Sequence, residues 1–308
     1  MPMTIAPRAM RRNSASAAPT PATCSSVLIV TIRPTLLSRK GRWRASPTAH
    51  GSANTSAARR HTRQERSTPA ARAPPAFAPA DLFAQLLARH PSPYSAYLDR
   101  GAWSLVSNSP ECCLRRAGDD VSTYPIKGTR PRGEGPEADK AMASHLLSSV
   151  KERAEHLMIV DLERNDLGRV CRYGSVHVPT FASVRTYGSL HHLESEVKGV
   201  LRAGTSLAAS LRATFPGGSI TGAPKVRAMQ IIDELEDVSR GFYTGAIGLV
   251  TNEEARFNVA IRTAEVSDGI VRYHAGGGIV ADSDPAAEYE ETNLKASAFF
   301  GALRALSE

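Results

Sequence analysis

The chain has 308 residues, and its 42% hydrophobic content is enough to bury the core of one large domain or two ordinary domains. The net charge of +8 is unevenly distributed. Residues 1–80 hold thirteen Lys or Arg against one acid, Glu65, whereas the remainder holds 25 against 29. The basic charge therefore gives no reason to expect a nucleic-acid partner for the remainder. No apolar run approaches the roughly 20 residues that span a bilayer, so no membrane association is expected either.

Residues 1–77 form a head rich in Ala, Arg, Ser, Thr and Pro, without a sustained hydrophobic period. Such a composition buries too little apolar surface to offset the entropy of ordering, so we expect a disordered basic head. Residues 78–308 are expected to form the folded domain.

From residue 81 onward, hydrophobic periodicity and turn residues divide the chain into regular elements. A helix over residues 82–89 precedes short strands over 94–98, 103–107 and 112–116, a helical stretch over 137–166 and a strand-rich segment over 175–198. A helix over 225–235, strands over 243–250, 255–265 and 270–274, and a helix over 285–306 complete the chain. Runs of strands between isolated helices favour an α+β fold of antiparallel sheets packed with helices.

The four cysteines are Cys24, Cys112, Cys113 and Cys171, and they form no CxxC pair or zinc spacing. We therefore expect reduced thiols in the core of a protein from a reducing compartment.

Carboxylates at helical spacing indicate a cation site. Asp284 and Pro285 make a good helix start, so Glu288, Glu291 and Lys295 share one face within about 60°. Such a face suits a hard divalent cation beside an anionic substrate, although a solvated charged stripe is the alternative for this spacing alone. Glu152 and Glu155 repeat the i, i+3 arrangement on the earlier helix, where surface decoration is the alternative.

Several long motifs follow one another along the chain. They are residues 125–129 (PIKGT), 155–169 (EHLMIVDLERNDLGR), 191–196 (HHLESE), 215–225 (FPGGSITGAPK), 260–263 (AIRT), 275–280 (AGGGIV) and 284–292 (DPAAEYEET). In this order they closely resemble the chorismate-utilising enzymes over about residues 78–306. The Lys in PIKGT is similar to component I of aminodeoxychorismate synthase, since anthranilate, salicylate and isochorismate synthases usually carry Ala there.

The resemblance implies an enzyme that converts chorismate and ammonia to 4-amino-4-deoxychorismate, for the p-aminobenzoate branch of folate synthesis. Glu291 and Glu155 would be Mg²⁺ ligands, with Glu288 a ligand through water. Two carboxylates plus a substrate oxygen are enough for Mg²⁺.

Chorismate carries two carboxylates, so its pocket needs cationic or N–H-rich receptors. Arg262 presents a planar fork that matches a carboxylate, although an Arg in an alternating strand is more often a surface residue. The predicted substrate-binding residues are Thr221, Tyr243, Arg262, Gly276, Gly277 and Lys295. The segment 217–225 lacks the phosphate-loop spacing and is interpreted as a wall of the site.

Three residues would carry the chemistry. Lys127, on a tight turn bounded by Pro and Gly, would add to C2 of the ring once burial or nearby positive charge lowers its pKa. Glu111 would be the general acid that protonates the departing C4 hydroxyl. His191 and His192 alternate in a strand and face opposite sides, and the resemblance makes His192 the inward one, near C4.

Alternative interpretations stay open. The nearest is an anthranilate synthase component I, which aminates C2, and another is a catalytically incompetent fragment, because the family places strands before residue 81 that the head does not supply. A start in the wrong reading frame would explain the head, and a transit peptide or a genuine tail are alternatives. We expect cytoplasmic localisation and ammonia supplied by a separate glutamine amidotransferase subunit.

Overall fold

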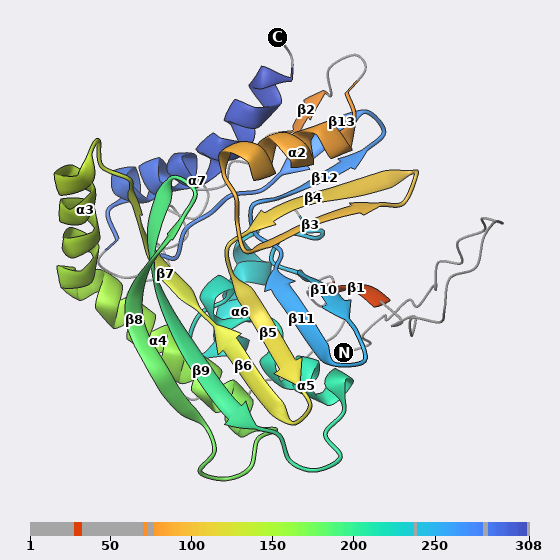
Figure 1. Ribbon diagram of the computed structural model, residues 1–308, viewed down its shortest axis with the longest axis vertical. Helices are drawn as coiled ribbons and strands as arrows, with labels where there is room; N and C mark the ends of the chain where they lie inside the picture. Colours follow the sequence, from red (N-terminus) through yellow and green to blue (C-terminus); the bar gives the residue numbers. More distant parts are fainter. Residues whose placement is uncertain (1–27, 33–69, 73–76, 237–238, 280–282, 307–308) are drawn as a thin grey trace, which may run out of the picture.

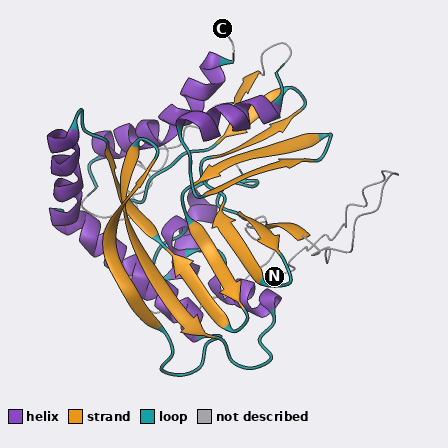
Figure 2. Cartoon of the chain, in the orientation of Figure 1, coloured by secondary structure: helices purple, strands orange, loops and turns teal. Residues whose placement is uncertain are grey.

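The computed structural model describes residues 28–32, 70–72, 77–236, 239–279 and 283–306. Within these residues the strands form two antiparallel sheets, with helices packed against them (Figures 1 and 2). Every strand pairing is antiparallel, so the predicted α+β class with antiparallel sheets is confirmed.

The larger sheet has the order β1-β10-β11-β5-β6-β9-β7, with β8 paired to β9. Its strands are β1 (Leu28–Ile32), β5 (Cys112–Ala117), β6 (Asp120–Tyr124), β7 (Ile126–Pro131), β8 (His177–Tyr187), β9 (Leu190–Val200), β10 (Ala246–Val250) and β11 (Glu254–Val259). The smaller sheet has the order β2-β13-β12-β4-β3. Its strands are β2 (Ala70–Arg72), β3 (Tyr94–Asp99), β4 (Trp103–Ser109), β12 (Thr263–Ser267) and β13 (Ile270–Tyr273).

The helices lie on different sheets. In Figure 1, α2 and α7 lie beside the smaller sheet, whereas α4 and α5 lie behind the larger one. The helical elements are α2 (Pro79–Arg89), α3 (Pro136–Ser148), α4 (Val150–Gly168), α5 (Leu207–Thr214), the 3-10 turn η1 (Gly218–Ile220), α6 (Lys225–Leu235) and α7 (Pro285–Ala305). In the part of the chain that the structure describes, no helix combines the length and apolar character needed to cross a membrane.

Each sheet has its own hydrophobic core. Val160 and Leu167 of α4 pack with Phe257 beneath the larger sheet. On the smaller sheet, Tyr273 stacks on Phe299 of α7 with ring centroids 4.0 Å apart. Cys112, Cys113 and Cys171 are buried and free, as predicted, and Cys24 lies outside the described residues.

Three predicted elements had wrong bounds. The helical stretch over residues 137–166 is two helices, because Ser149 caps a new start by accepting the Glu152 N–H at 3.3 Å. The strand over 243–250 begins only at Ala246, and the segment over 255–265 is two strands that belong to different sheets. The pattern of polar and apolar residues along the sequence does not reveal the point where the chain leaves one sheet for the other.

The head contributes to both sheets, contrary to the prediction that it supplies no strand. β1 pairs with β10, and β2 pairs with β13. The sequence of β1, LIVTI, is rich in β-branched residues, which suit a sheet, and each strand supplies hydrogen-bond partners to a neighbour's edge. The remaining residues of the predicted disordered head, 1–27, 33–69 and 73–76, lie outside the described residues.

A close contact between β10 and β11 yields a stability prediction. A side chain at Gly248 would collide with the ring of Phe257, which is fully buried. Gly248→Ala should therefore lower the free energy of unfolding by about 1–3 kcal/mol through overpacking. Gly301 lies in α7 with nothing near its side-chain position, so Gly301→Ala should be neutral or stabilising by up to about 1 kcal/mol. Urea unfolding of both variants decides, and equal effects would contradict this account.

Candidate active site

A cavity of about 540 Å³ lies where the two sheets meet, and β7, α4, α6 and α7 contribute to its walls. All the site residues predicted from the sequence line it: Glu111, Lys127, Glu155, His192, Thr221, Tyr243, Arg262, Gly276, Gly277, Glu288, Glu291 and Lys295. Residues separated by more than 180 positions are therefore brought to one place.

Lys127 lies in a strand and not on the predicted turn. β7 pairs with β9, and its register shifts between Lys127 and Thr129, which marks a bulge at Gly128. Gly128 has φ +71°, a conformation that favours glycine, and a side chain there would meet Leu146 at 2.8 Å. The bulge therefore explains why glycine stands at position 128, which sequence reasoning had assigned to a turn.

The amine of Lys127 is enclosed. Its side chain is 16% exposed, and Nζ lies 4.0 Å from Glu155 Oε2. A side chain at Gly278 would collide with this amine, so the backbone approaches it closely. Burial lowers the pKa of Lys127, and the charge of Lys295 lowers it further, against the opposing effect of Glu155. Burial and a nearby positive charge, the two effects expected from the sequence, therefore both act on this amine.

Glu111 stands just before β5 and is 3% exposed. Burial raises its pKa to about 7, although the N–H of Ile126 and the charge of Lys127 favour the ionised form. A carboxyl group that holds its proton near neutral pH can act as a general acid.

His192 and Arg262 are hydrogen-bonded inside the cavity. His192 Nδ1 lies 3.1 Å from the Gly128 carbonyl oxygen and Nε2 lies 3.0 Å from Arg262 Nη2. Nδ1 therefore donates and Nε2 accepts, and burial followed by the charge of Arg262 lowers the pKa of His192 to about 3. His191 instead contacts Asp139 of α3 at 2.8 Å, as the predicted alternation requires.

Arg262 belongs to neither flanking strand. It has φ +50° between β11 and β12, a strained conformation for a residue with a side chain. Its bond to the neutral His192 uses one of the five N–H donors of the guanidinium, which leaves donors for an anion. Burial also lowers the pKa of Arg262.

The predicted carboxylates line one side of the cavity and are paired with lysines. Glu291 Oε1 accepts from Lys295 Nζ at 2.6 Å. Lys151 Nζ lies 3.2 Å from Glu288 Oε1 and 3.9 Å from Glu155 Oε1. Burial raises the pKa of Glu155. For Glu291 burial also acts to raise the pKa, but Lys295, Lys127 and Arg130 together lower it.

The predicted start of α7 is confirmed, since Asp284 accepts the Ala287 N–H at 2.8 Å. The glycine run packs against this helix. A side chain at Gly277 would lie 3.0 Å from Glu288 Oε2, and Lys295 Nζ donates to the Gly276 carbonyl at 3.3 Å. These glycines allow close packing around the charged groups.

The wall formed by residues 217–225 is as predicted. Thr221 Oγ1 donates to the Gly217 carbonyl at 2.8 Å, so its lone pairs remain available to a ligand. Lys225 begins α6 and pairs with Asp166 of α4. This ion pair fixes the wall to α4.

The donor set fits a hard divalent cation. Among the described residues no group of three or more His, Cys, Asp or Glu is arranged to hold a metal. Mg²⁺ nevertheless needs only one or two carboxylates together with substrate oxygens and water. The Lys151 ammonium is a positive group placed between two of the predicted ligands, Glu155 and Glu288, and so shows that this spot attracts a cation.

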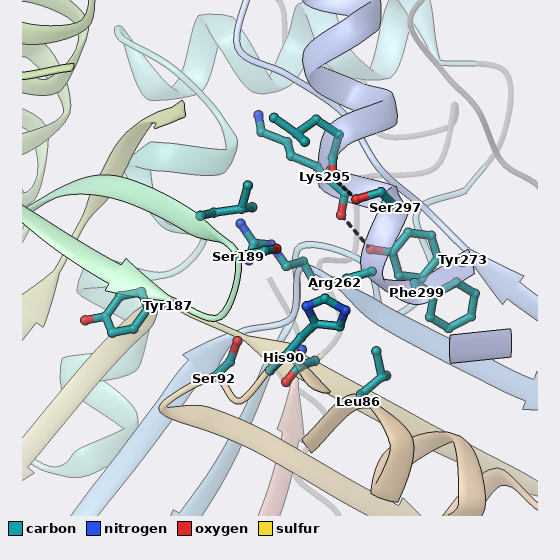
Figure 3. Close-up of a pocket in the computed structure, with 14 residues that line it drawn as sticks. Leu86, His90, Ser92, Tyr187, Ser189, Arg262, Tyr273, Lys295, Ser297 and Phe299 are labelled. Carbon is teal, nitrogen blue, oxygen red and sulfur yellow. Dashed lines mark hydrogen bonds between the residues drawn. The ribbon is translucent and has the colours of Figure 1, made fainter. Parts of the chain in front are cut away.

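A second cavity of about 20 Å³, large enough for one water molecule, adjoins the first (Figure 3). Arg262, Tyr273 and Lys295 line both cavities. His90 also lines the small cavity, and its buried Nδ1 has no hydrogen-bond partner. Sequence reasoning missed His90, Tyr273 and Lys151. Of these three residues, only Lys151 had a signal in the sequence, which is its i, i+4 spacing to Glu155.

The chain is similar in sequence and in structure to known proteins. The family model described as chorismate binding enzyme matches residues 59–301. Anthranilate synthase component 1 1 of Haloarcula marismortui is 50% identical over 75% of this chain and 48% of its own length. Aminodeoxychorismate synthase component 1 of Bacillus subtilis is 47% identical over 75% and 49%.

The crystal structure of anthranilate synthase component I from Streptococcus pneumoniae TIGR4 superposes with a TM-score of 0.67. It is 37% identical and covers 79% of this chain and 56% of that one. The chain spans about half the length of the curated relatives it matches. The match begins at residue 59 and so includes part of the predicted head.

A buried carboxyl group beneath the site yields a pH prediction. Glu163 of α4 is 7% exposed, its Oε2 has no hydrogen-bond partner, and burial raises its pKa from 4.5 to about 8. Between these two values the folded protein keeps a proton that the unfolded chain releases, so this group destabilises the fold increasingly as pH rises through the window.

The free energy of unfolding of Glu163→Gln should therefore exceed that of the parent by about 2–4 kcal/mol at pH 9, and by little at pH 4. Urea titrations at both pH values measure this difference. Glu290→Gln is the control, because it makes the same substitution at an exposed position. An equal response of both variants to pH would contradict the assignment of the cost to Glu163.

Proposed function

Because the chain belongs to the chorismate binding enzyme family, we propose that it is a component I of aminodeoxychorismate synthase, which converts chorismate and ammonia to 4-amino-4-deoxychorismate. Relatives with this name and with the name anthranilate synthase match at 47% and 50% identity, so overall similarity does not choose between the two reactions. The choice rests on a residue inside the cavity.

The observation that carries the proposal is the enclosed amine of Lys127. Burial and Lys295 lower its pKa, which increases the fraction of free amine, the form that acts as a nucleophile. The resemblance associates Lys at this position with amination at C4, and Ala with the other chorismate enzymes. An anthranilate synthase is the second candidate, favoured by the 50% identical relative.

The proposed first step forms a bond between Lys127 Nζ and C2 of chorismate. Both ring double bonds shift by one position, from C1=C2 and C5=C6 to C6=C1 and C4=C5, and the C4 hydroxyl leaves as water, with its proton supplied by Glu111. The raised pKa of Glu111, about 7, keeps the acid protonated near neutral pH.

In the proposed second step ammonia attacks C4, both double bonds shift back and the C2–N bond breaks, which restores the Lys127 amine. The ionised Glu111 then accepts a proton from the new ammonium group. The net change is chorismate plus ammonia to 4-amino-4-deoxychorismate plus water. His192, neutral and bonded to Arg262, lies on the side that we assign to C4.

Substrate binding is assigned to the remaining residues of the cavity. Arg262 and Lys295 would receive the two chorismate carboxylates, and Tyr243, Thr221, Gly276 and Gly277 would line the ring. Mg²⁺ bound by Glu155 and Glu291, with Glu288 through water, would neutralise one substrate carboxylate.

The setting of the reaction is also part of the proposal. The component numbering in the names of the relatives supports a multisubunit enzyme, so we assign the ammonia supply to a separate glutamine amidotransferase subunit. The folate branch and the cytoplasm are the expected pathway and compartment.

Lys127→Ala should slow formation of 4-amino-4-deoxychorismate by about a hundredfold or more, or about 2.7 kcal/mol of barrier, since the covalent route is lost. Mass spectrometry after a chorismate quench should find an adduct on Lys127 in the parent and none in the variant. Lys198→Ala, on β9 outside the cavity, should leave both unchanged. Anthranilate as the parent's product would favour the second candidate, and full activity of Lys127→Ala would sink the nucleophile assignment.

Glu291→Gln should weaken Mg²⁺ binding by about tenfold or more, because a neutral amide is a poorer ligand for a hard cation. Chorismate affinity measured with Mg²⁺ present should fall with it, since coupling between two ligands is reciprocal. Titration calorimetry with each ligand alone and together tests this. Parent-like binding of both ligands would place the metal elsewhere.

A further inference from the structure

Lys151 forms a bridge between two helices at the edge of the cavity. It lies in the first turn of α4, one turn before Glu155, whereas Glu288 lies in the first turn of α7. Its ammonium is 3.2 Å from Glu288 Oε1 and 3.9 Å from Glu155 Oε1. A single positive group thus holds two carboxylates that come from distant parts of the sequence.

The three lysines of the site differ in their access to solvent. The side chain of Lys151 is 45% exposed, whereas Lys127 is 16% and Lys295 is 23% exposed. The carboxylates that Lys151 contacts are 12% and 7% exposed. Lys151 can therefore move its charge into water by rotating its flexible stem, while its partners stay in place.

The charges of the site are nearly balanced. Glu155, Glu288 and Glu291 face the ammonium groups of Lys151 and Lys295, and the amine of Lys127, which the proposed function requires in its free form, lies beside Glu155. A divalent cation added to this set would leave an excess of positive charge in a poorly solvated cavity. Withdrawal of one ammonium to water reduces that excess and frees carboxylate oxygens for the metal.

We propose that Lys151 is an internal competitor of the divalent cation: its ammonium occupies the Glu155–Glu288 position and leaves it when the metal binds. The proposal rests on the metal site of the proposed function, but not on the position that is aminated. Lys151 accordingly sets the metal affinity of the free enzyme, and keeps Glu155 and Glu288 oriented for ligation.

A direct role of Lys151 in chorismate binding is the competing explanation, because Lys151 also lines the cavity. The two explanations predict different changes in Mg²⁺ affinity when Lys151 is replaced. Removal of a competitor strengthens Mg²⁺ binding without chorismate, whereas removal of a substrate contact weakens chorismate binding and leaves Mg²⁺ binding unchanged.

Magnesium titration calorimetry without chorismate tests the proposal on Lys151→Met, which removes the charge and keeps an unbranched side chain. We expect Mg²⁺ binding about three- to tenfold tighter than in the parent. Lys198→Met is the matched control, since Lys198 is 46% exposed and pairs with Glu196 at 3.5 Å outside the cavity, and it should bind as the parent does. Lys151→Arg should stay close to the parent.

Unchanged or weaker Mg²⁺ binding by Lys151→Met overturns the proposal, and so does the absence of Mg²⁺ binding by parent and variant alike. Failure of the proposed function is a separate result, because anthranilate as product leaves the prediction for Lys151 intact.

A second measurement uses the unmutated chain. After reductive ¹³C-methylation, the Lys151 signal, assigned by its loss in Lys151→Met, should shift on addition of Mg²⁺ toward the position of a solvated lysine. The Lys198 signal should not move. A Lys151 signal that stays in place while calorimetry reports bound Mg²⁺ would also refute displacement.

Discussion

The site depends on the pairing of lysine and carboxylate charges in a cavity with little access to water. An unpaired charge in such a place costs several kcal/mol, so each must find a partner. Lys127 of β7, Glu155 of α4 and the Glu291–Lys295 pair of α7 meet for this reason. Electrostatic pairing thus joins elements that are far apart in the sequence.

Burial also brings the two proposed reacting groups toward compatible protonation states. In water, a lysine and a glutamate form an ion pair at neutral pH, with neither a free amine nor a protonated acid. Enclosure lowers the pKa of Lys127 and raises that of Glu111 to about 7, because it disfavours the charged form of both. Both shifts favour a free amine beside a protonated carboxyl group, the two states that the proposed addition with loss of the C4 hydroxyl requires.

Sequence reasoning identified twelve residues that line the cavity, but not all of its lining and not all the backbone that holds it. The start of α7 was predictable because Asp284 caps it locally. The strand at β7 was not, since Pro125 and Gly128 read as a turn and the pairing that makes it a strand comes from β9. The run LIVTI of β1 was likewise discounted, because its partner edge on β10 lies more than 200 residues further along the chain. Lys151 was not singled out from the sequence, because its contact with Glu288 depends on where α7 lies.

The division of labour in the cavity follows from these placements. In the proposed roles, Arg262, Lys295 and the carboxylates would suit any reaction of chorismate, because they would bind its carboxylates and a cation and would not select the carbon that is attacked. The Gly128 bulge and the close approach of Gly278 hold the Lys127 amine at one position. An Ala at residue 127 would leave the receptors for the substrate in place but no amine at that position. On the proposed function, one side chain redirects the reaction without any change in the binding walls, in keeping with two differently named relatives that are each about half identical to this chain over the aligned residues.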